Sequence, residues 1–263
     1  MSSSSLSAFA RSLPSSEASS DYDDPRLEPT LSAVNWDVLA AVGIKAYGLA
    51  PGEPTFHWGE QFDGGYNLAR FLHLHNRSDT ILVVRVPLLS KEAGDLDYHE
   101  AIANKIASEV ASMQYVERFT TIPVPHIYCY SPQLDPHVGS PYIVMAKAEG
   151  VRLVSVWQTM EESLRRSVLS QVIDILLELW SHRFEKQGCL FRHTDGPATN
   201  GKDDWFTQPT SLLQPNKTCV AARAGSRPHR TAAAYWHAYA NVRLEETKEE
   251  FGQLYASANY LRM

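Results

Sequence analysis

Phe62-Asp63-Gly64-Gly65-Tyr66-Asn67 is a glycine turn, and the apolar run Thr80-Ile81-Leu82-Val83-Val84-Arg85-Val86 follows it with a single charge. We predict strands over residues 66–75 and 80–86, joined by the turn-forming tetrad at residues 76–79. A near-continuous apolar run is typical of a strand that is covered on both faces. The sequence therefore predicts a hairpin whose second strand is buried and encloses the guanidinium of Arg85.

A helix is predicted over residues 98–119, and it carries the acid Glu109 on its apolar stripe. An unpartnered guanidinium inside a protein is costly, so we expect Glu109 to face Arg85 in a direct ion pair. Two alternatives stay open, in which Arg85 points to water from an edge strand or Glu109 lies at the boundary of the stripe. Gly64-Gly65 alone is equally a plain hairpin turn. Together, the cation, the helix acid and the glycine turn are parts of a clamp for nucleotide phosphates.

The composition is ordinary for a globular protein of 263 residues, with 44% hydrophobic and 21% charged residues. The net charge of −6 argues against nucleic acid as a partner, because phosphate backbones favour clustered Lys and Arg. Three cysteines without a CxxC spacing argue against a disulfide framework and indicate a reducing compartment. No apolar run is long enough to cross a membrane, so no membrane partner is expected. The ten histidines are scattered singly, so no metal site is expected either.

The sequence pattern divides the chain into three regions. Residues 1–30 are Ser-rich and then acidic, which predicts a disordered tail. Arg11 without an acid in residues 1–13 leaves a mitochondrial presequence as the alternative to a cytoplasmic protein. Residues 31–147 hold the hairpin and the helix. Residues 148–263 are helical, with an apolar helix over about 160–186, a long loop over about 192–230 and a last helix over about 231–254.

Several segments, in this order along the chain, resemble the aminoglycoside phosphotransferase-like kinases, especially their fungal branch. They are Gly64–Asn67, Val83–Pro87, Ser108–Val116, Thr121–Pro125, Tyr142–Met145, Glu149-Gly150 and Gly188–Phe191. The resemblance covers roughly residues 35–191 and implies an α+β fold. This fold has a protein-kinase-like N-lobe over residues 31–147, made of a twisted antiparallel sheet and one helix, and an incomplete helical C-lobe over residues 148–263.

The resemblance also implies ATP and Mg2+ as cofactors and transfer of the γ-phosphate to a small-molecule hydroxyl. Arg85 stands where family members hold the nucleotide phosphates, with Glu109 as its helix partner. Gly64 and Gly65 would approach the phosphates from above, and a hinge near Met145 would complete the nucleotide site. The acceptor molecule is not identified by the sequence.

The catalytic half of such an enzyme is hard to find in this sequence. The family's catalytic loop reads H-x-D-x-x-x-x-N, and the stretch His193–Asn200 has that spacing, with Asp195 as its acid. We see no apolar strand after it, so we interpret the match as coincidence and expect an exposed loop. Two hypotheses stay open: a working small-molecule kinase that uses Asp195 and Asn200, or an inactive nucleotide-binding or interaction fragment. In the second case, the apolar helix over residues 160–186 is expected to leave an exposed face for self-association.

Overall fold

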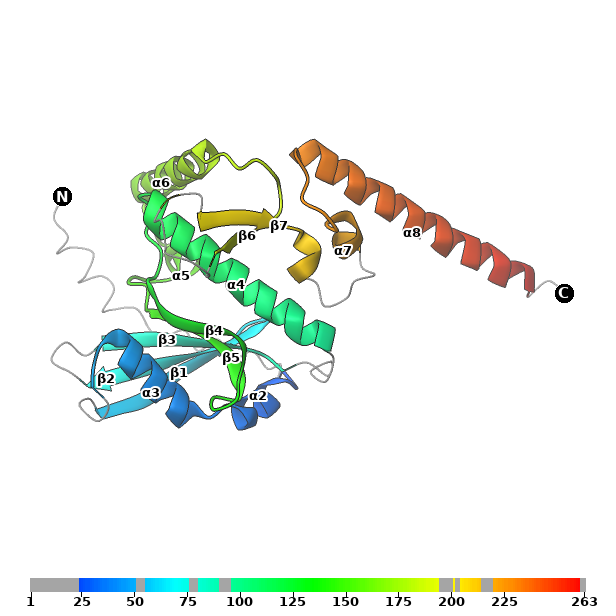
Figure 1. The fold of residues 1–263 in the computed structure, drawn as a ribbon. Coiled ribbons are helices and arrows are strands. Elements are labelled where there is room, and N and C mark those ends of the chain that lie inside the picture. The colour runs from blue at the N-terminus through cyan, green and yellow to red at the C-terminus, as the bar shows by residue number, and fades with distance from the viewer. Residues whose placement is uncertain are drawn as a thin grey trace.

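The computed structural model describes residues 24–50, 55–75, 80–89, 96–193, 201, 204–213 and 220–260. They form an α+β structure around a five-stranded antiparallel sheet with the strand order β1-β2-β3-β5-β4 (Figure 1). The strands are β1 (Thr55–Asp63), β2 (Asn67–His75), β3 (Thr80–Pro87), β4 (Ile127–Asp135) and β5 (Ser140–Ala146).

The hairpin predicted from the sequence is β2–β3, and it lies at the centre of the sheet between β1 and β5. Strand β1 was not predicted. Its register with β2 shifts between Trp58 and Gln61, and most of its side chains are exposed. Because the bulge interrupts the alternation of apolar and polar residues, the strand gives no clear period-two signal.

Helices α2 (Leu27–Ala33) and α3 (Trp36–Tyr47) cover one face of the sheet. Asn35 begins α3 by accepting a hydrogen bond at its side-chain oxygen from the amide of Val38 at 3.2 Å. Gly48 ends it with a φ of 95°. The disordered tail predicted over residues 1–30 is therefore wrong for residues 24–30, because α2 begins within them; residues 1–23 lie outside the described part.

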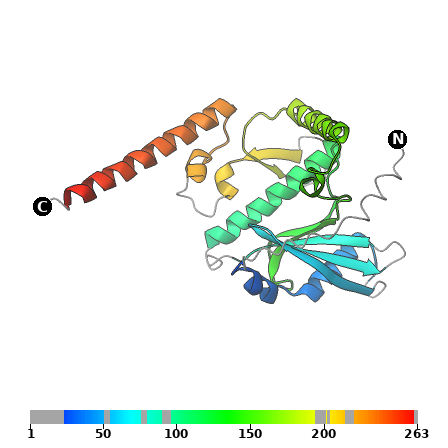
Figure 2. The same cartoon turned by 180° about the vertical axis from the view of Figure 1, so that it is seen from behind.

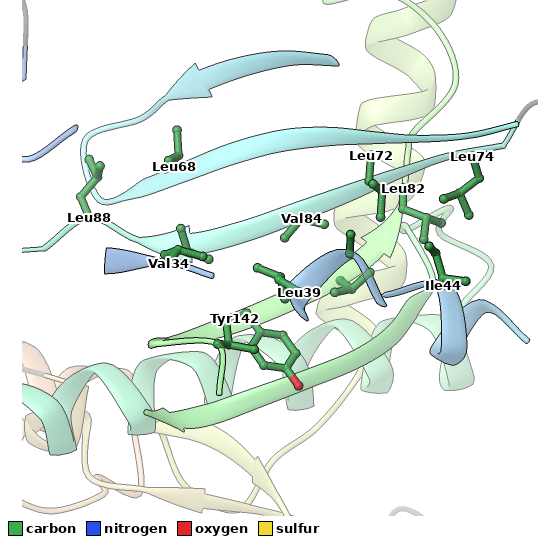
Figure 3. Close-up of a cluster of buried hydrophobic side chains, with 14 residues drawn as sticks. Val34, Leu39, Ile44, Leu68, Leu72, Leu74, Leu82, Val84, Leu88 and Tyr142 are labelled. Atoms are coloured by element: carbon green, nitrogen blue, oxygen red, sulfur yellow. The ribbon is translucent and has the colours of Figure 1, made fainter. Parts of the chain in front are cut away.

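The main core lies between α3 and this face of the sheet (Figure 3). Its fully buried side chains come from alternate positions of the two central strands, among them Leu72 on β2 and Leu82 and Val84 on β3. They pack against Leu39 and Ile44 of α3. The apolar run at the start of β3 therefore supplies this core from every second residue.

Helix α4 (Leu96–Phe119), close to the predicted range, packs on the opposite face of the sheet (Figure 1). Ile106 and Val110 of α4 form a second buried cluster with Ile143 and Met145 of β5. Val83 of β3 packs against the same cluster, whereas its neighbour Val84 faces α3. The sheet is thus covered on both faces, as the apolar run predicted.

The second region contains α5 (Leu153–Val156), α6 (Glu162–Ser181), β6 (Cys189–Arg192), β7 (Trp205–Gln208), η2 (Thr210–Leu213), α7 (Val220–Ala224) and α8 (Ala232–Tyr260). The long loop predicted over 192–230 is wrong for its described residues, because β7, η2 and α7 lie within it and β7 pairs with β6. Trp205 anchors this hairpin to α4, since its indole nitrogen donates to the carbonyl oxygen of Ala111 at 3.0 Å. Strand β7 has only four residues, too few for a periodic signal.

Helix α6 ends at Ser181, five residues before the predicted end, and none of its residues is buried. Eight of its apolar side chains are exposed: Leu164, Leu169, Val172, Ile173, Leu176, Leu177, Leu179 and Trp180. The exposed apolar face predicted for this helix is therefore confirmed. Helix α8 contacts α7 and extends away from the sheet and from α4 (Figures 1 and 2). Within the described residues, the helices are too short or too polar to span a membrane.

Candidate functional site

The centre of the candidate site is an ion pair between the sheet and α4. Arg85 lies on β3, opposite Ala69 of β2 and Ile143 of β5, and its Nη1 donates to Oε1 of Glu109 on α4. The predicted ion pair is therefore confirmed. The prediction that the pair is buried is not confirmed, because the side chains of Arg85 and Glu109 are 26% and 31% exposed. Both side chains are therefore partly buried and partly exposed to solvent.

The local sequence explains why these two side chains meet. Residues Val83 and Arg85 lie two positions apart on β3 and share the sheet face that α4 covers. On the helix, Glu109 follows Ile106 by three residues and precedes Val110, which are both buried against that face. Burial of the apolar neighbours therefore brings the carboxylate to the guanidinium.

The glycine turn connects β1 to β2, and Ala69, which lies opposite Arg85, follows Gly65 by four residues. The amide of Gly64 donates to the carbonyl oxygen of Asn67 at 2.8 Å, which closes the turn. Neither Gly64 nor Gly65 has a left-handed φ, so the backbone conformation does not require glycine there. A Cβ added at Gly65 would meet no atom within 4 Å. What the glycines provide is an exposed backbone without side chains, which a ligand can approach closely.

Two further cations reach the turn, and the sequence analysis did not identify either. Lys105 lies on α4 one turn before Glu109, and its Nζ sits 4.1 Å from the centre of the Tyr66 ring. Arg26 donates from Nη2 to the carbonyl oxygen of Gly65 at 2.9 Å. Its hydrogen bonds also lower the pKa of Asp24 to about 2. The spacing of four residues between Lys105 and Glu109 was a readable signal, whereas the contact of Arg26 depends on tertiary structure.

The remaining predicted site residues fall in different places. The side chain of Met145 is buried in the cluster beneath α4, so it forms part of the core next to the ion pair, and its contact with a nucleotide stays a prediction. His193 is exposed at the end of β6 and stacks on Phe206 with ring centres 4.2 Å apart. Asp195 and Asn200 lie outside the described residues.

A cavity of about 440 Å³ lies further along α4, between this helix, the end of α6 and β6. Ser108, Ser112 and Tyr115 line it from α4. The hydroxyl of Tyr115 lies 2.8 Å from Nδ1 of His182, and burial raises the pKa of this tyrosine. Because Ser108 precedes Glu109, the cavity adjoins the helix segment that carries the ion pair.

Comparisons with known proteins link the chain to fungal proteins. It is 28% identical over 133 residues to a subtelomeric hrmA-associated cluster protein of Aspergillus fumigatus, a match that covers 51% of this chain and 24% of that protein. It is 32% identical over 120 residues to the altered inheritance of mitochondria protein 9, mitochondrial, of Meyerozyma guilliermondii, covering 45% and 19% of the two chains. The protein of that name in Clavispora lusitaniae is 30% identical over 144 residues, covering 52% and 22%.

The matched part of this chain thus spans about a fifth to a quarter of the length of these relatives. No protein-family model matches the chain, and no solved structure does. The names of these relatives refer to no chemical reaction. Homology to fungal proteins of these two names over about half of the chain is what the comparisons establish.

Proposed function

We propose that this chain is the nucleotide-binding part of a small-molecule kinase similar to the aminoglycoside phosphotransferase-like family. In this proposal Arg85 holds the phosphates of ATP, Glu109 positions Arg85, and the Gly64-Gly65 turn covers the phosphates. A protein-kinase-like N-lobe over residues 31–147 and a helical C-lobe from residue 148 onwards would be the finer description of the α+β fold.

The observation that carries the proposal is the ion pair between Arg85 of β3 and Glu109 of α4, next to a strand that begins directly after an open glycine turn. A guanidinium holds two phosphate oxygens through parallel hydrogen bonds. Because about a quarter of its side-chain surface is exposed, Arg85 can reach a ligand while Glu109 fixes its position. The absence of a side chain at Gly65 lets the same ligand come close to the turn.

Two cations contact the turn, Lys105 through the ring of Tyr66 and Arg26 through the carbonyl oxygen of Gly65, although Arg26 is also paired with Asp24. Together with Arg85 they would favour the negative charge of nucleotide phosphates. ATP would supply the γ-phosphate for transfer to a small-molecule hydroxyl. Magnesium prefers oxygen ligands, and the carboxylate of Glu109 is engaged by Arg85. We therefore assign no magnesium ligand to this chain, and Mg2+ would arrive on the nucleotide.

The test is calorimetric titration of the full chain with Mg-ATP. We expect binding that Arg85→Ala weakens by at least about 10-fold, because a charge-assisted contact to phosphate is lost. Arg166→Ala is the matched control, because Arg166 also forms an ion pair, with Glu162 at 3.0 Å, but lies on the exposed surface of α6. No heat of binding at millimolar ATP, or equal affinities for the two variants, would contradict the proposal.

A second candidate function is an interaction role without catalysis, and the exposed apolar face of α6 favours it. Leu169, Ile173, Leu177 and Trp180 are between 51% and 74% exposed, which is unusual for four large apolar side chains on one helix. Since a second copy of the chain carries the same face, self-association through α6 is the interaction we propose. Phosphate transfer by the purified chain would favour the kinase over this candidate.

We propose that the chain is located in mitochondria, as the names of some of its relatives indicate for those proteins. Proteins with the name altered inheritance of mitochondria protein 9 carry the designation mitochondrial. The Ser-rich residues 1–13, with Arg11 and no acid, suit the mitochondrial alternative better than the cytoplasmic one. A fluorescent fusion at the C-terminus of the full chain, compared with one that lacks residues 1–23, tests the location. Equal cytoplasmic signal from both fusions would contradict it.

A further inference from the structure

The cavity beside α4 lies where this helix meets the end of α6 and the β6–β7 hairpin (Figure 1). Its volume of about 440 Å³ falls within the range of about 300–1,000 Å³ that is usual for small-molecule sites. Most of its wall is apolar or aromatic and comes from Tyr115, Val116, Leu179, Phe184 and Leu190. A wall of this kind with a few polar groups is typical of a site for a small and largely apolar molecule.

Aromatic rings that are held by their own packing form part of this wall. The ring of Tyr115 is 5% exposed, and its centre lies 5.2 Å from the centre of the Phe184 ring. Several polar atoms beside it have partners within the protein. The hydroxyl of Tyr115 meets Nδ1 of His182 at 2.8 Å, and the hydroxyl of Ser112 donates to the carbonyl oxygen of Ser108 at 2.7 Å. The wall therefore favours a flat aromatic ligand, which packs well against ordered rings.

One polar group of the cavity wall lacks a partner, and it belongs to Gln187. The backbone of this residue is fixed by an antiparallel bridge to His229, whose amide donates to the carbonyl oxygen of Gln187 at 3.0 Å. The side-chain Oε1 of Gln187 is covered from solvent and makes no hydrogen bond with the described residues. In the described part of the chain, no other residue that lines this cavity has such a buried side-chain atom. A covered acceptor without a donor is costly, and a ligand that donates to it removes that cost.

We propose that this cavity binds a small flat aromatic molecule that carries a hydrogen-bond donor on its ring, such as an indole or a phenol. The ring packs against Tyr115 and Phe184, and its N–H or O–H group donates to Oε1 of Gln187. Rotation about the last torsion of the glutamine side chain, which has a broad preference, brings this oxygen to the donor. The site is separate from the proposed nucleotide clamp, because Arg85 and Glu109 do not line the cavity.

Equilibrium dialysis of the full chain against indole tests the proposal, with N-methylindole as the matched ligand that has the same rings but no donor. We expect a single site, and we expect indole to bind about 3–10-fold more tightly than N-methylindole, which is the usual effect of one neutral hydrogen bond. Gln187→Leu should weaken the binding of indole until the two ligands bind equally. Gln133→Leu is the matched control, because Gln133 is exposed on β4, and this variant should keep the preference for indole.

Two further measurements keep the result clear of misfolding and of binding elsewhere. Without ligand, Gln187→Leu should melt at the same temperature as the parent chain or higher, because it removes an acceptor that has no donor. Val116→Phe, which fills part of the cavity, should weaken the binding of both ligands, whereas Ile173→Glu on the exposed face of α6 should not. No binding at about 1 mM indole, equal affinities of the parent chain for the two ligands, or binding that Ile173→Glu abolishes and Val116→Phe preserves would overturn the proposal.

Discussion

Removing Glu109 should destabilise the chain, and the size of this effect depends on how exposed its ion pair with Arg85 is. Fully buried pairs cost about 3–5 kcal/mol when one partner is removed, and surface pairs contribute about 0–1 kcal/mol. Arg85 and Glu109 are 26% and 31% exposed, so Glu109→Ala should cost about 2 kcal/mol. At roughly 2–4 °C per kcal/mol for a domain of this size, the melting temperature should fall by about 4–8 °C.

Calorimetric melting of matched variants checks this magnitude and separates stability from binding. Glu117→Ala is the control, because Glu117 is also on α4 and pairs with His126 at 2.7 Å on the exposed surface; it should cost less than about 1 kcal/mol. The apolar double variant Arg85→Met with Glu109→Leu should regain most of the lost stability, since no charge is left without a partner. It should not regain binding of Mg-ATP. A stable double variant that binds the nucleotide as tightly as the parent chain would refute the clamp.

Further outcomes are expected at Lys105, Cys129 and Ile173. Lys105→Gln should weaken the binding of ATP by about 3–10-fold, because the ammonium of Lys105 lies at the glycine turn, and it should weaken the binding of AMP less. The control Lys45→Gln on α3 should change the affinity for neither nucleotide in the same titration. Burial raises the pKa of the Cys129 thiol to about 11, so iodoacetamide should modify it far more slowly in the folded chain than in urea. The buried neutral thiol of Cys129 contributes fully to the free energy of unfolding below pH 9, the pKa of the thiol in the unfolded chain. This contribution is lost as the pH rises from about 9 towards 11, and urea titrations across this pH range measure the loss. Ile173→Glu should abolish self-association in light scattering, whereas Ser167→Glu, which lies about 120° around α6 from Ile173, should not. A parent chain that stays monomeric at all concentrations would exclude the α6 interface.

The elements predicted correctly share one property, which is a long and uninterrupted hydrophobic period. Strands β2 and β3 and helix α4 each bury one side regularly, and their apolar residues repeat accordingly. Strand β1 is bulged, and β7 is only four residues long, so neither has a period to read.

The part of the candidate site that could be predicted consists of charged residues inside apolar segments. A charge inside an apolar strand needs a partner, and an acid on an apolar helical stripe needs one too, so Arg85 and Glu109 indicated each other. Arg26 has no such conflict, and it reaches Gly65 only because α2 lies beside the glycine turn. The sequence therefore predicts contacts that relieve a burial cost, and tertiary structure alone supplies the contacts between exposed groups.

Helix α4 connects the candidate clamp to the second region within two helical turns. Glu109 binds Arg85, while the carbonyl oxygen of Ala111 accepts a hydrogen bond from Trp205 at 3.0 Å. Four residues further along the helix from Ala111, Tyr115 packs against Trp205 and bonds His182 at the end of α6. The end of α6, the β6–β7 hairpin and the partner of Arg85 are therefore all held by one segment of α4 that is less than two turns long.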